Sequence, residues 1–162
     1  MSQENPIDTS TLRQCFGSFM TGVTVVTTKD GNEPIGFTAN SFSSVSLDPP
    51  LLLICIDNNS DNFDAFTKGQ HFGVNVLAHD QEELSNTFAK SVDDRFENVD
   101  WQESDIGNPI LNNCSAFFDC TLEATHEAGD HVIMVGRIKS WHDSGKNGLG
   151  YHRGGYFTLG QQ

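Results

Sequence analysis

The chain contains 162 residues, with nine Lys and Arg against 22 Asp and Glu and a net charge of −13 at pH 7. Nucleic acids and anionic lipids are negatively charged, so this composition argues against both as partners. The longest apolar run, residues 51–56, is far too short to span a bilayer, and residues 1–11 lack the basic start and apolar core of a secretory signal. We therefore expect one cytoplasmic domain over residues 1–162, with its core at about 12–159 and no membrane association.

The cysteines and histidines form no recognisable metal or disulfide pattern. No two cysteines make a CxxC pair, none has a histidine at zinc-finger spacing, and the six histidines form no HExxH motif. We expect no metal site, and we expect the four thiols to be small buried side chains in a reducing compartment. These four residues are Cys15, Cys55, Cys114 and Cys120.

The beginning of the chain predicts a helix followed by a β-hairpin. The helix is predicted from four apolar residues at helical spacing, which are Leu12, Phe16, Phe19 and Met20. Thr21-Gly22 is expected to end this helix. Residues 23–28 are rich in Val and Thr, as in a strand, and a turn at 29–32 leads to a second strand near 35–38.

The rest of the chain predicts further strands separated by short helices. The polar segment 39–46 is interpreted as a loop, and helices are expected around Phe63 and Phe66 and over residues 80–90. The additional strands are expected at 51–57, 72–77, 116–125, 132–141 and 155–159. Six or seven strands joined mostly by hairpins, with short flanking helices, indicate a mainly β, antiparallel barrel.

Three segments are candidates for function, although each also has a plain structural explanation. Residues 36–46 alternate short hydroxyl and amide side chains with aromatics, which fits either a polar loop or a rim that contacts the edge of a planar heteroaromatic ligand. Asn40 can both donate and accept a hydrogen bond, as such a ring requires. His131 follows a Gly-Asp turn, and residues 151–156 place two tyrosines around Gly-Gly; either segment is also typical of a surface turn.

Two basic residues are a further candidate. Lys90 and Arg95 lie close together in an otherwise acidic chain, either as solvated charges or as a phosphate clamp. No phosphate-binding loop, dinucleotide fingerprint or nucleophile motif accompanies them. None of these signals decides the function alone.

In their order along the chain, six motifs resemble those of the short-chain flavin reductases of two-component monooxygenases, in the flavin-binding split-barrel superfamily. The motifs are FMTGVTVVT at 19–27, GFTANSF at 36–42, SVSLDPPL at 44–51, FGVNVL at 72–77, GDH at 129–131 and YHRGGY at 151–156. The resemblance covers nearly the whole chain. It departs from the family where Phe-Ala-Gly is common and this chain has Phe88-Ala89-Lys90.

The resemblance implies a Greek-key split barrel that forms a homodimer. It further implies that NADH or NADPH reduces FMN or FAD by hydride transfer from nicotinamide C4 to flavin N5, and that the reduced flavin passes, possibly by diffusion, to a separate monooxygenase. Such chemistry needs no protein nucleophile, because the cofactor carries out the difficult step. The choice between FMN and FAD, the choice between NADH and NADPH, the oxygenase that is served and the tightness of flavin binding stay open.

The resemblance also implies the positions of the site residues. The flavin would lie against Thr38, Ala39, Asn40, Ser41, Cys55, Ile56, Asp57, Ser60, Phe88, Ala89 and Arg95, with Arg95 at its phosphate. The nicotinamide side would be shaped by Pro34, Ile35, Gly36, Phe37, Tyr151, Arg153 and Tyr156. His131 is the one residue assigned to catalysis, as a neutral imidazole that positions the nicotinamide and transfers no proton.

Three other functions stay open at this point. A flavin-binding or storage protein on the same fold would bind flavin without turnover, and a flavin-dependent oxidase would keep its flavin and act on an organic substrate. A plain interaction domain would bind no ligand. His131 and the 151–156 segment argue against storage, and the loop at 38–46 argues against an interaction domain.

Overall fold

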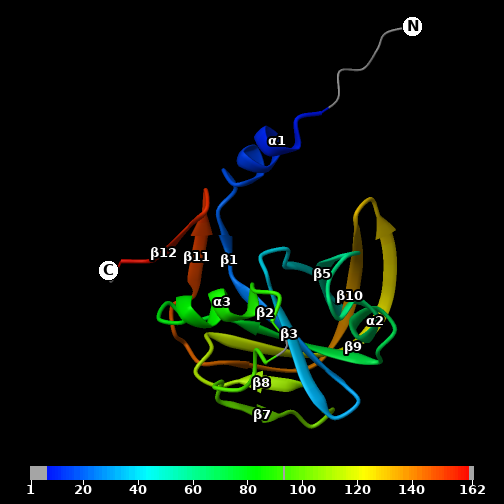
Figure 1. Cartoon of the computed structure of the whole chain (residues 1–162). Coiled ribbons are helices and arrows are strands. Elements are labelled where there is room, and N and C mark those ends of the chain that lie inside the picture. The colour runs from blue at the N-terminus through cyan, green and yellow to red at the C-terminus, as the bar shows by residue number, and fades with distance from the viewer. Residues whose placement is uncertain (1–6, 93, 161–162) are drawn as a thin grey trace, which may run out of the picture.

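The computed structural model describes residues 7–92 and 94–160, and antiparallel sheet dominates this part of the chain (Figure 1). Its largest sheet has seven strands in the order β3-β2-β6-β9-β10-β5-β4. They are β2 (Thr24–Asp30), β3 (Glu33–Ala39), β4 (Ser43–Leu47), β5 (Pro50–Asp57), β6 (His71–Val76), β9 (Ala116–Ala128) and β10 (His131–Asp143). Every neighbouring pair is antiparallel, so the predicted mainly β, antiparallel class is confirmed, and the strand order agrees with a split barrel.

Five shorter strands and three helices complete the described residues. The strands are β1 (Thr21–Gly22), β7 (Trp101–Glu103), β8 (Pro109–Leu111), β11 (Leu149–His152) and β12 (Gly155–Thr158). The helices are α1 (Thr9–Phe16), α2 (Phe63–Thr67) and α3 (Glu82–Phe88). The count of six or seven strands is too low for this part of the chain, because β1, β4, β7, β8 and β11 give no clear signal in the sequence.

Strand β4 occupies the second half of the polar segment 39–46, which was expected to be a loop, whereas residues 40–42 do form one. It pairs only with β5, at the edge of the large sheet, and four of its five residues are exposed. An edge strand with this much solvent contact needs no alternation of apolar and polar residues. The short polar side chains that favour a loop are therefore equally compatible with an exposed edge strand.

Helix α1 ends earlier than its apolar spacing predicts. The backbone N–H of Gly17 donates to the Arg13 carbonyl and closes the helix at Phe16, so Phe19 and Met20 lie beyond it. No residue of α1 is buried, and Phe16 and Phe19 are 70% and 78% exposed. Figure 1 shows α1 standing away from the sheets, so its apolar residues do not belong to the core of a single chain.

Two apolar clusters fill the interior and fix the large sheet. One includes Phe72, Cys120 and Met134, and the other includes Val25 and Phe88. Gly136 in β10 is needed for this packing, because a Cβ there would lie 2.6 Å from Phe72 Cζ and 3.0 Å from Cys120 Cβ. The register shift of β10 against β9 falls at this glycine, as is common where a strand bends around a large side chain.

Candidate functional site

One face of the β5–β10 pair forms the centre of the candidate site. The register places His131 opposite Asp57 and Ile133 opposite Cys55. Because side chains alternate along a strand, these four residues share one face, and the buried Ile54, Ile56, Val132 and Met134 occupy the other. The strand end therefore presents a thiol, a carboxylate and an imidazole outside the core, while the side chain of Ile56 lies within it.

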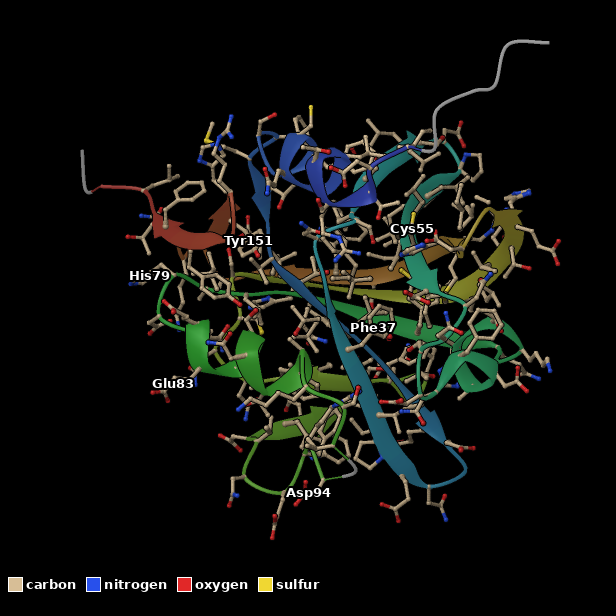
Figure 2. The ribbon with its side chains drawn as sticks, turned by 45° about the horizontal axis from the view of Figure 1, so that its top comes forward. Phe37, Cys55, His79, Glu83, Asp94 and Tyr151 are labelled. Carbon is tan, nitrogen blue, oxygen red and sulfur yellow. The ribbon has the colours of Figure 1, made fainter. Side chains whose placement is uncertain are left out.

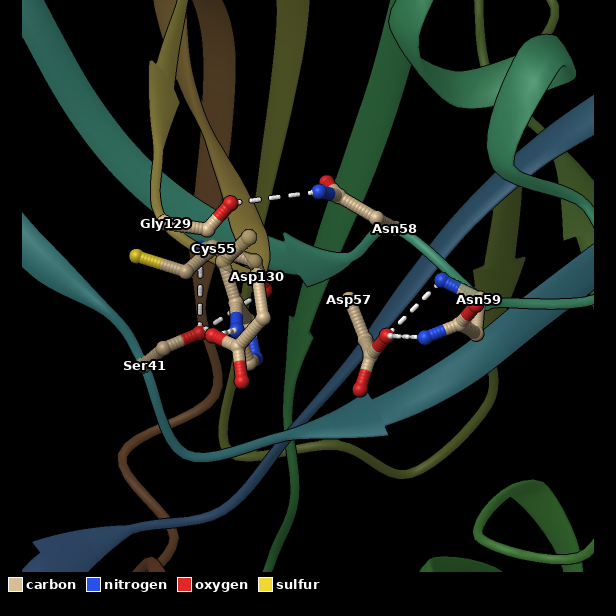
Figure 3. A network of polar contacts seen from close by, with 8 residues as sticks. Ser41, Cys55, Asp57, Asn58, Asn59, Gly129 and Asp130 are labelled. Carbon is tan, nitrogen blue, oxygen red and sulfur yellow. Dashed lines mark hydrogen bonds and ion pairs between the residues drawn. The ribbon is translucent and has the colours of Figure 1, made fainter. Parts of the chain in front are cut away.

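Hydrogen bonds between the loop after β5 and the turn before β10 hold the end of this face in place (Figure 3). The backbone N–H of Asn58 donates to the Asp130 carbonyl at 3.0 Å, and its side-chain amide donates to the Gly129 carbonyl at 3.3 Å. Asp57 Oδ1 accepts from the Asn59 backbone at 2.8 Å. Residues after β5 are thus fixed against the turn before β10, although the two segments lie more than 70 positions apart in the sequence.

A hydrogen bond to the neighbouring residue orients the His131 ring. Its Nδ1 lies 2.7 Å from Asp130 Oδ1. A carboxylate only accepts, so Nδ1 carries the proton and Nε2 is the acceptor of the neutral ring. The hydrogen bond from His131 also lowers the pKa of the Asp130 carboxyl. The imidazole is 42% exposed, so Nε2 is available to a donor on a bound molecule.

The segment between β3 and β4 lies beside this face. The Ser41 hydroxyl accepts from the Cys55 N–H at 3.0 Å and donates to the Cys55 carbonyl, so it fixes the loop to β5 (Figure 3). Asn40 is exposed, and its side chain makes no hydrogen bond among the described residues. Within the same described part, the backbone of residues 40–42 has no backbone partner. Free edge donors and one free amide therefore adjoin the β5–β10 face.

The surroundings of the Cys55 thiol disfavour its thiolate form. Burial raises its pKa, and the nearby Ser41 hydroxyl opposes only part of that effect. The group stays a neutral thiol at physiological pH. Its place on the open face suits contact with a flat ligand.

A second cluster joins β3 to α3 and the C-terminal strands. Thr38 Oγ1 donates to the Ser85 carbonyl at 2.6 Å, and the Ser85 and Tyr156 hydroxyls lie 2.8 Å apart. Tyr151 and Tyr156 meet edge to face at 5.3 Å. In Figure 2 Tyr151 and Cys55 lie in the upper half of the molecule, to the left and right of its centre, and Phe37 lies below them. The two tyrosines are thus joined to β3 through Ser85 of α3.

The remaining predicted positions divide by burial. Phe88 is only 1% exposed and packs under Gly36, where a Cβ would lie 3.1 Å from the Phe88 ring. A contact from residue 88 to a ligand must therefore come from its backbone. Ala89 is exposed at the end of α3, and Ser60 is half-buried just after β5. Four others lie on β3, namely Pro34, Ile35, Phe37 and Ala39. Arg153 lies in the turn after β11.

Arg95 lies away from the imidazole, beside β3. It donates to the carbonyls of Gly36 and Lys90, and its Nη2 lies 3.1 Å from Asp61 Oδ2. A cavity of about 170 Å³ adjoins this group, and a larger one of about 410 Å³ lies between α3 and residues 94–99. Neither is lined by Asn40, Cys55 or His131, so the face that carries them lies outside both cavities.

Sequence reasoning missed three residues that organise this region, namely Asn58, Asp61 and Ser85. Each bonds to a residue that is distant in sequence, so the local sequence gives no signal of its role. Only an alignment of the surrounding motif with related proteins would single it out. Within residues 7–92 and 94–160, no three His, Cys, Asp or Glu side chains converge as metal ligands would. In the same residues no helix has both the length and the hydrophobicity to cross a bilayer.

The family described as "Flavin reductase like domain" matches residues 16–160. The chain is 54% identical over 152 residues to the "Probable flavin reductase" of Rhizobium meliloti. The alignment covers 93% of this chain and 49% of that protein. It is 53% identical over 148 residues to the reductase component of the flavin-dependent trigonelline monooxygenase of Acinetobacter baylyi. That alignment covers 91% of this chain and 48% of the relative. The chain therefore spans about half the length of these two curated relatives.

The fold is also similar to a solved structure of comparable length. This is the NADH:FAD oxidoreductase of Streptomyces globisporus C-1027 in complex with NAD and FAD fragments, with a TM-score of 0.92 and 36% identity over 99% of this chain and 98% of that one. Fold and site thus define a mainly β, antiparallel protein with an open polar face at the ends of β3, β5 and β10. The chain belongs to the flavin reductase-like domain family.

Proposed function

We propose that this protein reduces FMN or FAD with NADH or NADPH and supplies the reduced flavin to a separate monooxygenase. The observation that carries the proposal is the face formed by Cys55, Asp57 and His131 beside the free donors of residues 40–42. This donor set fits the polar edge of a flavin ring. When bound, the flavin accepts a hydride, so the chain needs no nucleophile of its own.

Each part of the site then has a defined task. Asn40 and the backbone N–H groups after it bind the ring edge and stabilise the negative charge that develops there on reduction. The Cys55–Asp57 strand end lines the ring, and Ser60 and Arg95 lie toward its phosphate. His131 Nε2 accepts a hydrogen bond from the nicotinamide carboxamide or ribose and orients the donor. Tyr151 and Tyr156 close the nicotinamide side.

The relatives support both the reaction and the partner. One is named as the reductase component of a flavin-dependent monooxygenase, and another was solved with NAD and FAD fragments. The match to residues 16–160 supports one domain with the predicted core of about 12–159. We also place the protein in the cytoplasm, because all four cysteines are free thiols, as is usual in a reducing compartment.

Anaerobic oxidation of NADH and NADPH with added FMN or FAD tests the function directly, followed by the loss of reduced-nicotinamide absorbance. We expect consumption that depends on added flavin. Flavin binding without consumption of either nucleotide would favour the storage function. A flavin that stays bound through purification and is reoxidised only with an organic substrate would favour the oxidase.

Asn40→Ala should weaken flavin binding about tenfold, because it removes an amide whose loss leaves a polar ring atom unpaired. The fold should survive, since Asn40 is exposed and has no internal partner among the described residues. Fluorescence titration with FMN measures the effect. Asn32→Ala is the matched control, because Asn32 lies in the exposed turn between β2 and β3. Equal affinities for all three proteins would move the ring away from Asn40.

We propose a homodimer as the functional assembly. Apolar side chains are exposed on two segments of a single chain, before β1 and along β4, and isolated proteins rarely leave such a set in water. They are Leu12, Phe16, Phe19, Met20, Val45 and Leu47. A second copy that covers these residues would also add a wall to the open flavin face.

Light scattering should give a mass near twice that of the chain, and Phe16→Glu should give a monomer because it places a charge in the proposed interface. Gln14→Glu is the control, since residue 14 lies two positions from both Leu12 and Phe16 and so on the opposite side of α1. A monomeric wild-type protein, or a dimer that tolerates Phe16→Glu, would contradict this assembly.

A further inference from the structure

Arg95 is tied to three separate segments of the fold. Nε donates to the Lys90 carbonyl at 2.6 Å, Nη1 to the Gly36 carbonyl at 2.8 Å, and Nη2 to Asp61 Oδ2 at 3.1 Å. A guanidinium has five N–H donors, so these contacts leave donors for a further acceptor. Two of the three partners are carbonyls, which hold the side chain without neutralising its charge. Asp61 is the only anion among them.

The two charged partners differ in how easily they can move. The Arg95 side chain is 11% exposed, and its hydrogen bonds to two backbone carbonyls fix it between β3 and the segment after α3. The Asp61 side chain is 54% exposed, and this ion pair is its only hydrogen bond among the described residues. Asp61 can therefore turn into water at small cost, whereas Arg95 stays in place.

The pair borders the smaller cavity. Its volume is about 170 Å³, and Arg95, Asp61, Asn62 and Gly36 contribute to its walls. Ser60, expected near the flavin phosphate, precedes Asp61 directly. An anionic group that enters this cavity meets the fixed cation and its movable counterion together.

We propose that Asp61 competes with the flavin phosphate for Arg95 and thereby sets how strongly the site prefers FMN to riboflavin. This inference rests on the proposed function. With the phosphate absent, the carboxylate neutralises Arg95. With it present, the carboxylate repels a group of about −2 charge, which keeps phosphate binding weak. Weak retention suits a protein that must give its reduced flavin to another enzyme.

The test is a pair of fluorescence titrations, with FMN and with riboflavin, on the wild type and Asp61→Asn. The amide keeps the size and the acceptor atom but removes the charge. FMN should bind about tenfold more tightly to the variant, while riboflavin affinity changes less than about twofold. Asp64→Asn is the matched control, because Asp64 loses the same charge three residues away, where it pairs with Lys68 outside the cavity.

The possible outcomes distinguish failure of the Asp61 role from failure of the proposed function. Unchanged FMN affinity in Asp61→Asn, or parallel changes for FMN and riboflavin, would overturn the role of Asp61 alone. A lower KM for NADH with riboflavin as acceptor, without tighter FMN binding, would assign Arg95 to the dinucleotide phosphates and overturn it as well. A wild-type protein that binds neither flavin would reject the proposed function itself. Thermal unfolding of each variant confirms that the fold is intact.

Discussion

Asn75→Ala should lower the free energy of unfolding by about 3 kcal/mol, the largest stability change that we expect from a polar substitution in this chain. Asn75 is fully buried in β6. Its amide donates to the Val25 carbonyl and the Thr27 hydroxyl, both at 3.1 Å, and its Oδ1 accepts from the Leu111 N–H at 2.8 Å. Alanine removes all three bonds and leaves the buried Leu111 N–H without this acceptor, which weakens the attachment of β8 to β6.

Urea unfolding measures this loss, with Asn32→Ala as an exposed control that should change stability by less than about 0.5 kcal/mol. Asn75→Asp adds a second readout. It keeps an acceptor toward Leu111 but turns a buried carboxylate toward the Val25 carbonyl, which raises the pKa of that carboxyl in the folded state. Its deficit relative to the wild type should shrink as the pH falls and the carboxyl becomes a neutral donor. A deficit that is small and independent of pH would refute the assigned network.

His131→Ala should reduce kcat/KM for NADH or NADPH about tenfold, because it removes the acceptor that we assign to the nicotinamide carboxamide or ribose. We expect a higher KM for the nucleotide and slower anaerobic flavin reduction in stopped flow. Flavin affinity should stay close to the wild-type value, since we assign the binding of the ring to Asn40 and the neighbouring backbone. We assign the imidazole a positioning role, so no proton transfer should be lost.

His142→Ala is the control for this substitution, because His142 is exposed at the far end of β10. His131→Gln gives the readout that separates positioning from a structural role. The glutamine oxygen restores an acceptor without titrating, so it should recover part of the rate with little change between pH 5 and 8, the range in which a free imidazole titrates. Wild-type kinetics for His131→Ala would remove this residue from the site.

Some features of the site follow directly from local sequence. Gly129-Asp130 predicts the turn that places His131 at the start of a strand, and the structure has that turn at the same position. The alternation along 116–125 predicts β9, although the strand continues to Ala128 because its outer end is exposed and needs no apolar face. These signals are local, since turns and two-residue periodicity depend on adjacent residues.

Other features required the folded chain. Thr38, Asn40 and Ser41 are similar short polar residues in sequence, yet Thr38 and Ser41 donate to backbone carbonyls and only Asn40 stays free among the described residues. Arg95 is equally undetermined, because its counterion Asp61 lies 34 positions away. The apolar spacing at the start of the chain correctly predicts helix α1. It does not predict that this helix lies outside the core.

The sequence by itself therefore determined the β class, the main turns and the order of the motifs, because each of these depends on neighbouring residues. Only the tertiary structure decided which polar groups are committed to the fold and which are free for a ligand. That division depends on strand registers such as Asp57 opposite His131, which join residues more than 70 positions apart. Hydrogen-bond partners over such separations are fixed by packing of the whole sheet rather than by any local pattern.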